Sequence, residues 1–172
     1  DTQHEEWVDS LGQGGPNPYQ RYAVKDFTHE GAANIRAYQR KGHAAFVEHE
    51  MAERRASATK RAFEVYGGEA NWNKKIREQV EALANRVGEM AAHLEAALAR
   101  GPSFQGTIWR GMSNVSPEDA KRQFGNVGGI IELPESNSFA KVRRSAWFGN
   151  LQIEILDSKR SGVDVDIISS LK

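Results

Sequence analysis

The sequence predicts an α+β fold in which helices come first and strands follow, and three observations carry this prediction. Residues 28–100 are mostly helix formers. Residues 104–172 contain short apolar runs with the alternation and the β-branched residues that are typical of strands. The two kinds of segment are separated along the chain, so we expect a mixed or antiparallel β core rather than a parallel sheet of βαβ units.

The composition is that of one ordinary globular domain. The chain has 172 residues, of which 39% are hydrophobic and 27% are charged. Lys plus Arg and Asp plus Glu each number 23, so net charge gives no general attraction to nucleic acid or to an anionic membrane. No apolar run reaches the roughly 18 residues of a membrane-spanning helix, and the absence of cysteine excludes disulfides, thiolate nucleophiles and cysteine-bound zinc.

The helical half divides into an arm and several helices. Residues 1–25 are predicted to form a flexible arm, because the run G-Q-G-G-P-N-P at 12–18 holds neither a helix nor a strand, and residues 26–172 form a single domain. Residues 28–67 predict two helices with a break near Gly42, and residues 71–100 predict one long helix. The long helix carries a core-facing stripe of Ile76, Val80, Leu83, Val87, Met90, Leu94 and Leu98.

The second half predicts short strands around one small helix. Ser116 and Pro117 start that helix, with Ser as the N-cap and Pro at the first helical position, and it runs to about Phe124. A short helix or turn is expected at 143–148. The expected strands lie at 106–112, 128–133, 136–138, 151–156 and 163–168.

Arg110 raises the functional question, because a guanidinium beside Trp109 at the end of an apolar strand needs an anionic partner. A protein carboxylate, Glu132 or Asp166, would serve, and so would a ligand phosphate. The sequence has no phosphate loop of the G-x-x-x-x-G-K type and no G-x-G-x-x-G. The five histidines are spread over the helical half without ligand spacing, so we expect no metal site.

Four motifs in the second half occur in a recognisable order. They are T-I-W-R-G at 107–111, S-N-S at 136–138, A-W-F at 146–148 and S-G-V-D-V-D-I-I-S-S at 161–170. This order resembles the Arg-Ser-Glu class of mono-ADP-ribosyltransferases, in which helices precede an aromatic-Arg-Gly strand that is followed by Ser-Thr-Ser and then Glu-x-Glu. The resemblance covers the chain from about residue 25 and implies a β core of the ADP-ribosyltransferase type. Asn137 replaces the usual threonine, and Glu-x-Glu would be expected within a few residues after Lys172.

The resemblance also implies a substrate, NAD, and roles for individual residues. Arg110 would bind the phosphates or the ribose of NAD. Gly111 would let the nicotinamide approach the backbone closely. Phe148, or its neighbour Trp147, would stack on the nicotinamide ring. Ser136 and Ser138 would be the catalytic serines that orient a carboxylate. That carboxylate would be the missing glutamate or, displaced from it, Glu132 or Glu135, and Arg143 and Arg144 would add phosphate contacts.

Three functions remain open on these grounds. The leading expectation is a secreted bacterial effector or toxin that acts as a monomer in the host cytoplasm and transfers ADP-ribose to a host protein, with arginine as the expected acceptor. The alternative is a catalytically degenerate member that binds a peptide or protein partner in the Arg110 cleft, where Arg21 of the arm is a candidate occupant. The third is a helical scaffold whose 71–100 stripe docks to another protein. None of the three involves nucleic acid or a membrane.

Overall fold

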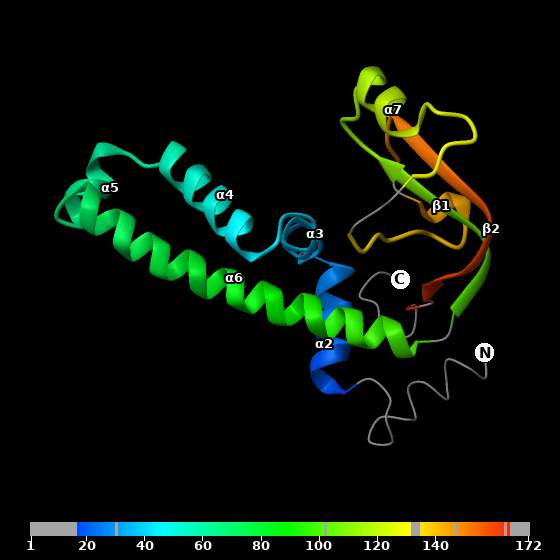
Figure 1. Ribbon diagram of the computed structural model, residues 1–172, viewed down its shortest axis with the longest axis horizontal. Coiled ribbons are helices and arrows are strands. Elements are labelled where there is room, and N and C mark those ends of the chain that lie inside the picture. The colour runs from blue at the N-terminus through cyan, green and yellow to red at the C-terminus, as the bar shows by residue number, and fades with distance from the viewer. Residues whose placement is uncertain are drawn as a thin grey trace.

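The computed structural model describes residues 17–29, 31–101, 103–131, 135–146, 148–163 and 165. Within these ranges the protein is α+β, as predicted, with helices in the first part and an antiparallel pair of strands in the second (Figure 1). Helix α6, Glu69–Arg100, runs along the whole helical part and ends beside the start of the first strand (Figure 1). At about 1.5 Å per residue, its 32 residues span roughly 48 Å.

Four shorter helices precede α6, and each of them contacts it. They are α2, Pro18–Phe27; α3, Ala32–Lys41; α4, His43–Ala56; and α5, Lys60–Val65. The predicted break near Gly42 is confirmed, because this residue ends α3 and starts α4 with φ +77°, a backbone angle that glycine adopts readily. The prediction of two helices over residues 28–67 was wrong, because the structure has three there, namely α3, α4 and α5. A second break follows α4, since Thr59 accepts a hydrogen bond from the backbone of Ala62 and thereby caps a separate helix α5.

The prediction of a flexible arm over residues 1–25 was wrong for its last part. Asn17 caps α2 through a capping box: its side chain accepts from the Gln20 backbone N–H, while the Gln20 side chain accepts from the Asn17 backbone N–H. Ala23 and Val24 are 0% and 1% exposed, so α2 belongs to the core. Arg21 therefore lies within a packed helix and not in a loose arm. The arm's residues 1–16 lie outside the described residues.

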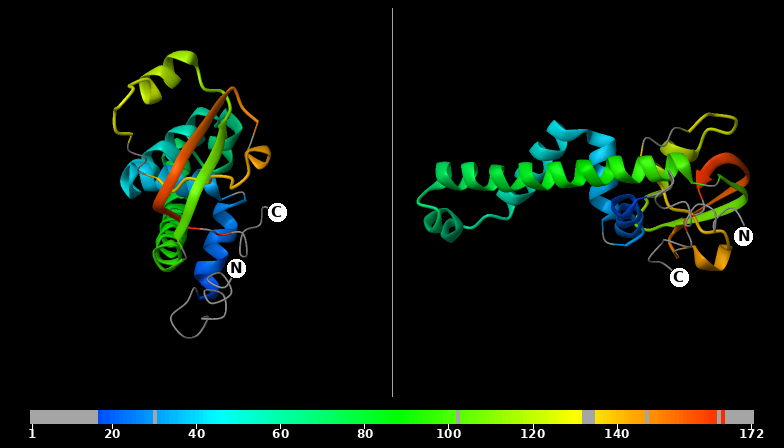
Figure 2. Two further views of the ribbon diagram at one scale, coloured as in Figure 1. Left: turned by 90° about the vertical axis from the view of Figure 1, so that its right-hand side faces the viewer. Right: turned by 90° about the horizontal axis from the view of Figure 1, so that it is seen from below.

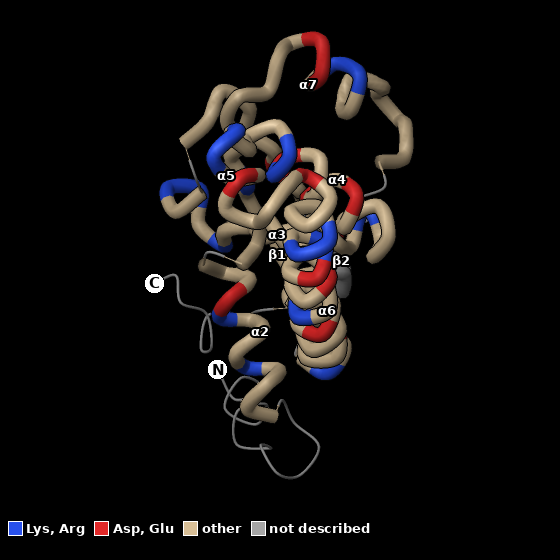
Figure 3. The backbone as a smooth tube through the Cα atoms, turned by 90° about the vertical axis from the view of Figure 1, so that its left-hand side faces the viewer, with Lys and Arg blue, Asp and Glu red and all other residues tan. Residues whose placement is uncertain are grey.

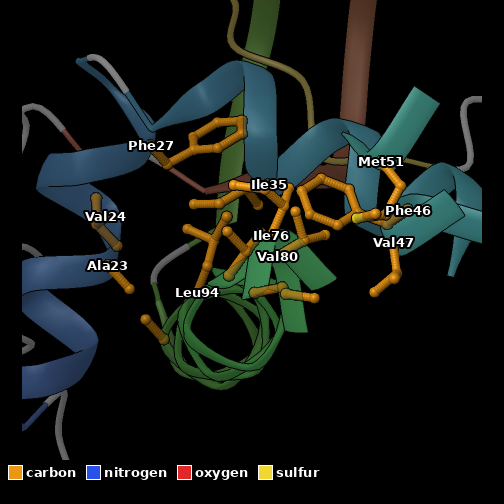
Figure 4. Packing of buried hydrophobic residues seen from close by; sticks show 14 of the residues in the cluster. Ala23, Val24, Phe27, Ile35, Phe46, Val47, Met51, Ile76, Val80 and Leu94 are labelled. Atoms are coloured by element: carbon orange, nitrogen blue, oxygen red, sulfur yellow. The ribbon is translucent and has the colours of Figure 1, made fainter. Parts of the chain in front are cut away.

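The hydrophobic core lies between α6 and the shorter helices. Ile35 of α3 and Phe46 of α4 point toward Val80 and Leu94 of α6 (Figure 4). The predicted stripe is confirmed, with Ile76, Val80, Val87 and Leu94 buried and Leu83, Met90 and Leu98 packed against the core. The stripe also includes residues that the prediction left out, namely Trp72, Ala84, Ala91 and Ala97. Their burial shows that this face of α6 is occupied within the chain itself, which leaves less of it for the scaffold function.

The sheet is an antiparallel pair of β1, Ser103–Met112, and β2, Leu151–Val163, which run side by side as a long ribbon (Figure 2). Register shifts between Phe104 and Gln105 and between Gly106 and Ile108 bend the ribbon. An isolated antiparallel bridge joins Trp109 to Ala140 on the other side of β1. The antiparallel pairing agrees with the predicted mixed or antiparallel β core. β1 lies between β2 and the bridge at Ala140.

Four of the predicted strands differ from the structure. Residues 128–131 form a turn and irregular chain, because Gly128 has φ +81° and Ile130 is 94% exposed, without the neighbour that a strand requires. Residues 136–138 are irregular rather than strand. The strand predicted at 151–156 is longer than expected, because β2 continues to Val163. It therefore includes the first residue of the strand predicted at 163–168. Residues 132–134 and 166–168 lie outside the described part of the chain.

The remaining elements are short. Helix α7, Pro117–Phe124, begins where predicted, with Ser116 as its N-cap. A single 3₁₀ turn, Arg143–Ser145, occupies the predicted short helix or turn. Basic and acidic residues are interspersed along α4 to α6 rather than segregated (Figure 3). Of the helices that the structure describes, none combines the length and apolarity needed to cross a bilayer.

Candidate functional site

Arg110 lies within β1, opposite Ile153 of β2. In an antiparallel pair, opposed residues share a face and alternate residues of one strand share it too. Ile108 and Met112 are therefore on the same face as Arg110, and their cross-strand partners Ile155 and Leu151 complete it. The guanidinium thus rises from an apolar surface, while Trp109 on the other face donates its indole N–H to Glu154 at 3.0 Å.

Two residues of the segment 135–140 contact the guanidinium. Arg110 Nη1 donates a hydrogen bond to Asn137 Oδ1. The Cζ atom of Arg110 lies 5.8 Å from the ring centroid of Phe139, within the range of a cation–π contact. Asn137 Nδ2 donates in turn to the carbonyl of Glu135 at 2.7 Å, which fixes the direction of the amide. The middle residue of the S-N-S motif is thus the one that holds Arg110.

The electrostatic surroundings of Arg110 combine burial with a second cation. Burial is the largest cause that lowers the pKa of Arg110, and the charge of Arg36 lowers this pKa further. The carboxylate of Glu135 acts in the opposite direction and raises the pKa of Arg110. A partly shielded guanidinium close to another cation attracts an anion more strongly than an isolated surface arginine does.

The segment 135–140 is held at both ends. At its start, Gln39 of α3 bonds to Ser136, accepting from the Ser136 backbone N–H at 2.9 Å and donating to Ser136 Oγ at 3.0 Å. Arg40 lies 3.6 Å from Glu135 Oε1. At its end, Ala140 exchanges backbone hydrogen bonds of 2.9 and 2.7 Å with Trp109. We call this assembly the Arg110 site, comprising Arg110, the segment 135–140, and Arg36, Gln39 and Arg40 of α3.

The structure brings some of the residues singled out in the sequence together. Arg110 and Ser136 belong to the same site, and Gly111 lies next to Arg110 in β1, opposite Gln152. Ser138 is exposed. Glu135, one of the two candidate displaced carboxylates, is at the site with its side chain 15% exposed. Trp147, Glu132 and Asp166 lie outside the described residues.

Phe148 is not the aromatic residue that the structure places against Arg110. Its side chain is 84% exposed, and its carbonyl accepts from Ser113 Oγ at 3.4 Å, beyond the end of β1. Phe139 takes that position instead, and sequence reasoning missed it. A signal was present, because alternate residues of an extended segment point to the same side, and Phe139 is two residues after Asn137.

The residues of α3 were also missed. Arg36, Gln39 and Arg40 have the spacing i, i+3, i+4, which places them on one face of a helix. This face meets the segment 135–140 and the surroundings of Arg110. Spacing alone would have revealed a shared face but not what it faces.

Two of the histidines make contacts within the helical part. His43 Nε2 lies 2.9 Å from Glu81 Oε2, and its Nδ1 lies 3.3 Å from the Tyr38 hydroxyl. His93 stacks on Tyr19 with ring centroids 5.7 Å apart. Over the described ranges, no group of three or more His, Asp or Glu side chains is placed to hold a metal ion.

Comparison with known proteins found no relative of this chain. No protein-family model, no curated protein and no solved structure matches the chain. The function is therefore argued from the Arg110 site itself.

Proposed function

We propose that the protein is an NAD-binding domain of the mono-ADP-ribosyltransferase type and that NAD binds at the Arg110 site. One observation supports this proposal above all. Arg110 and Asn137 are 27 residues apart in the sequence, yet they are hydrogen-bonded, so the aromatic-Arg-Gly strand and the S-N-S motif meet in space. The resemblance rests on these two motifs, and each motif alone has an ordinary structural explanation.

The chemistry of the site suits a dinucleotide. The guanidinium of Arg110 can bind pyrophosphate oxygens with a planar pair of N–H groups. In the proposed transfer, the bond between nicotinamide and ribose breaks and its electron pair leaves with the nicotinamide, which becomes neutral. The acceptor side chain then forms a bond to the same ribose carbon and releases a proton. A carboxylate is needed to stabilise the oxocarbenium-like state between these events.

The carboxylate of this step belongs to the proposal as well. In the resembling class this carboxylate belongs to the Glu-x-Glu pair, and we expect the same here. The alternative is Glu135, the described carboxylate that acts electrostatically on Arg110. Since Glu135 also lies beside Arg40, its first role is to balance the charge of the arginines. A Glu135→Gln variant that keeps full transfer activity assigns the reaction to another carboxylate.

Calorimetric titration with NAD tests the proposal directly. We expect saturable binding by the wild-type protein and its loss in Arg110→Met, with Arg122→Met as the control because Arg122 is exposed on α7 and pairs with Asp119 there. The absence of NAD binding by the folded wild-type protein would refute the proposal. Release of nicotinamide, and transfer of labelled ADP-ribose to protein, then test the reaction.

We extend the proposal to the biological setting that the resemblance implies, a secreted bacterial effector that modifies an arginine of a host protein. Incubating the protein with labelled NAD and a host-cell extract tests this extension. Labelling that hydroxylamine removes is expected for a modified arginine. Labelling of no protein, by an enzyme that does cleave NAD, excludes this setting.

A second candidate function has one specific observation in its favour. The Arg110 site already contains a carboxylate of the chain itself, because Glu135 lies beside Arg40 and acts on Arg110. A site with this preference would also bind an acidic side chain of a peptide. Titration with an acidic peptide and with NAD in parallel separates the two functions, because the peptide-binding form saturates with the peptide alone.

A further inference from the structure

Gln39 of α3 connects three parts of the molecule. Its Oε1 accepts the Ser136 backbone N–H at 2.9 Å, and its Nε2 donates both to Ser136 Oγ at 3.0 Å and to Glu95 Oε1 at 3.2 Å. Ser136 is 97 residues away in the sequence, and Glu95 is 56 residues away on α6. One amide therefore joins the helical part to the segment that holds Arg110.

Only one orientation of the Gln39 amide matches the donors and acceptors around it. A carboxylate accepts hydrogen bonds and cannot donate, so the Nε2 end must face Glu95. The Oε1 end then faces the Ser136 N–H, which can only donate. Glu95 thus selects the orientation in which Gln39 holds both the backbone and the hydroxyl of Ser136.

Gln39 acts where the segment 135–140 meets Arg110. The far end of the segment is fixed independently, by the backbone bonds between Ala140 and Trp109. Asn137, the next residue after Ser136, accepts from Arg110. The other contact at the near end is the ion pair between Arg40 and Glu135. It is 3.6 Å long and the Arg40 side chain is 54% exposed, so the ion pair contributes little to holding the segment in place.

We propose that Gln39 is a positioning residue for the Arg110 site. It sets the direction of the Ser136 hydroxyl and, through Asn137, the direction of the Arg110 guanidinium. This role in catalysis rests on the proposed function, whereas the positioning of Ser136 and Arg110 is a property of the protein without ligand.

The first experiment needs no ligand. Amide hydrogen exchange is measured residue by residue in the wild type, in Gln39→Met and in Asn34→Ala, which alters an exposed residue of the same helix. We expect the Ser136 amide to exchange about tenfold faster or more in Gln39→Met, because an unbonded amide loses its protection. The Ala140 amide, bonded to Trp109, serves as the internal control and keeps its wild-type rate. Equal exchange of Ser136 in all three proteins overturns the inference.

The second experiment uses NAD cleavage. We expect Gln39→Met to lower kcat about tenfold or more with KM within about twofold, because the serine and the arginine lose their alignment while the anion attraction persists. Asn34→Ala, at an exposed residue of the same helix, is the control and is expected to stay close to the wild type. Unchanged kcat and KM in a Gln39→Met protein whose Ser136 is mobile overturn the inference.

The two proposals fail in different ways. A wild type that neither binds nor cleaves NAD refutes the proposed function, while the exchange rate of Ser136 still decides whether Gln39 positions the site. If Gln39→Met does not fold, Gln39→Glu replaces it. This variant keeps the acceptor for the Ser136 N–H, loses the donor to Ser136 Oγ, and places a second carboxylate beside Glu95. We then expect slowed turnover and a Ser136 amide that remains partly protected. A Gln39→Glu protein with wild-type turnover and exchange contradicts the positioning role.

Discussion

The guanidinium of Arg110 lies over the ring of Phe139, with Cζ 5.8 Å from the ring centroid, while Asn137 accepts a hydrogen bond from its Nη1. The two partners are alternate residues of one segment and approach Arg110 from the same side. Arg110 is therefore supported by neutral groups, and its charge is only indirectly balanced by Glu135. Such an arrangement orients a cation and leaves its charge available to a ligand.

The first prediction concerns the cost of this charge. Because burial lowers the pKa of Arg110, the folded protein disfavours the charged form relative to the unfolded chain. Arg110→Met retains an apolar stem on the apolar face of the β1–β2 sheet, so we expect its free energy of unfolding to stay within about 1 kcal/mol of the wild type. Denaturant titration measures this. A loss of about 3 kcal/mol or more would instead identify Arg110 as a structural ion-pair residue.

The second prediction separates the two aromatic residues that compete for a role. Phe139→Leu removes the ring beneath Arg110, so we expect NAD affinity to fall by about two- to fivefold, the size of an exposed cation–π contact. Phe148→Leu should leave affinity unchanged if Phe148 only extends into solvent. Calorimetry on both variants checks this. A loss confined to Phe148→Leu would restore the nicotinamide-stacking role that the resemblance assigns to Phe148.

The third prediction concerns a close contact in the helical part. A Cβ added at Gly88 of α6 would lie 2.6 Å from the Tyr38 hydroxyl oxygen, which must move and give up its contact with His43. Gly88→Ala therefore destabilises by about 1–3 kcal/mol although alanine favours helix. Asn85→Ala, exposed on the same helix, is the control and should gain about half a kcal/mol. Thermal unfolding of both variants decides. A stabilised Gly88→Ala would show that Tyr38 moves without cost.

The helical half could be predicted to a large extent because its signals are local. The apolar stripe on α6 repeats with the helical period. Gly42 separates α3 from α4, and its φ of +77° is an angle that glycine adopts readily. The stripe's alanines were missed because the prediction relied on large apolar residues. Ala84 and Ala97 are 0% exposed, so small side chains belong to the buried face of α6 as well.

The site could be predicted only in part. The sequence contains both the Arg-Gly strand and the S-N-S motif, and in the structure Arg110 of the first is hydrogen-bonded to Asn137 of the second. Gln39 carried no signal, because a glutamine on a helix surface looks the same whether it faces water or a segment 97 residues away. The strand predicted at 128–133 was wrong over its described residues 128–131 for a similar reason. Its apolar residues suit a strand, but a strand needs a neighbour, and Ile130 is 94% exposed.

The fourth prediction tests the helix that the sequence reasoning treated as an arm. The signal for α2 was present in Asn17, Pro18 and Gln20, which form a capping box with proline at the helix start. Val24 is 1% exposed in the core, so Val24→Ala should lower the free energy of unfolding by about 1–3 kcal/mol. Tyr22→Ala, at a side chain that is 62% exposed, should change it by less than about 0.5 kcal/mol. Equal stability of both variants would return residues 18–25 to the arm.

The fifth prediction concerns pH and the bond between α4 and α6. Arg77 Nη1 and Nη2 donate to Glu48 at 2.8 and 3.4 Å, and this hydrogen bonding, with the charge of Arg77, lowers the pKa of Glu48 below its ordinary value of 4.5. A carboxyl with a lowered pKa in the folded state contributes stability above pH 4.5, and this contribution is lost as the pH falls through the folded pKa. NMR titration should show the pKa of Glu48 rising toward 4.5 in Arg77→Met and staying low in Lys74→Met, at an exposed neighbour on α6. High salt should weaken the shift, since both groups are exposed. A Glu48 pKa that is the same with and without Arg77 would show that the ion pair does not persist in solution.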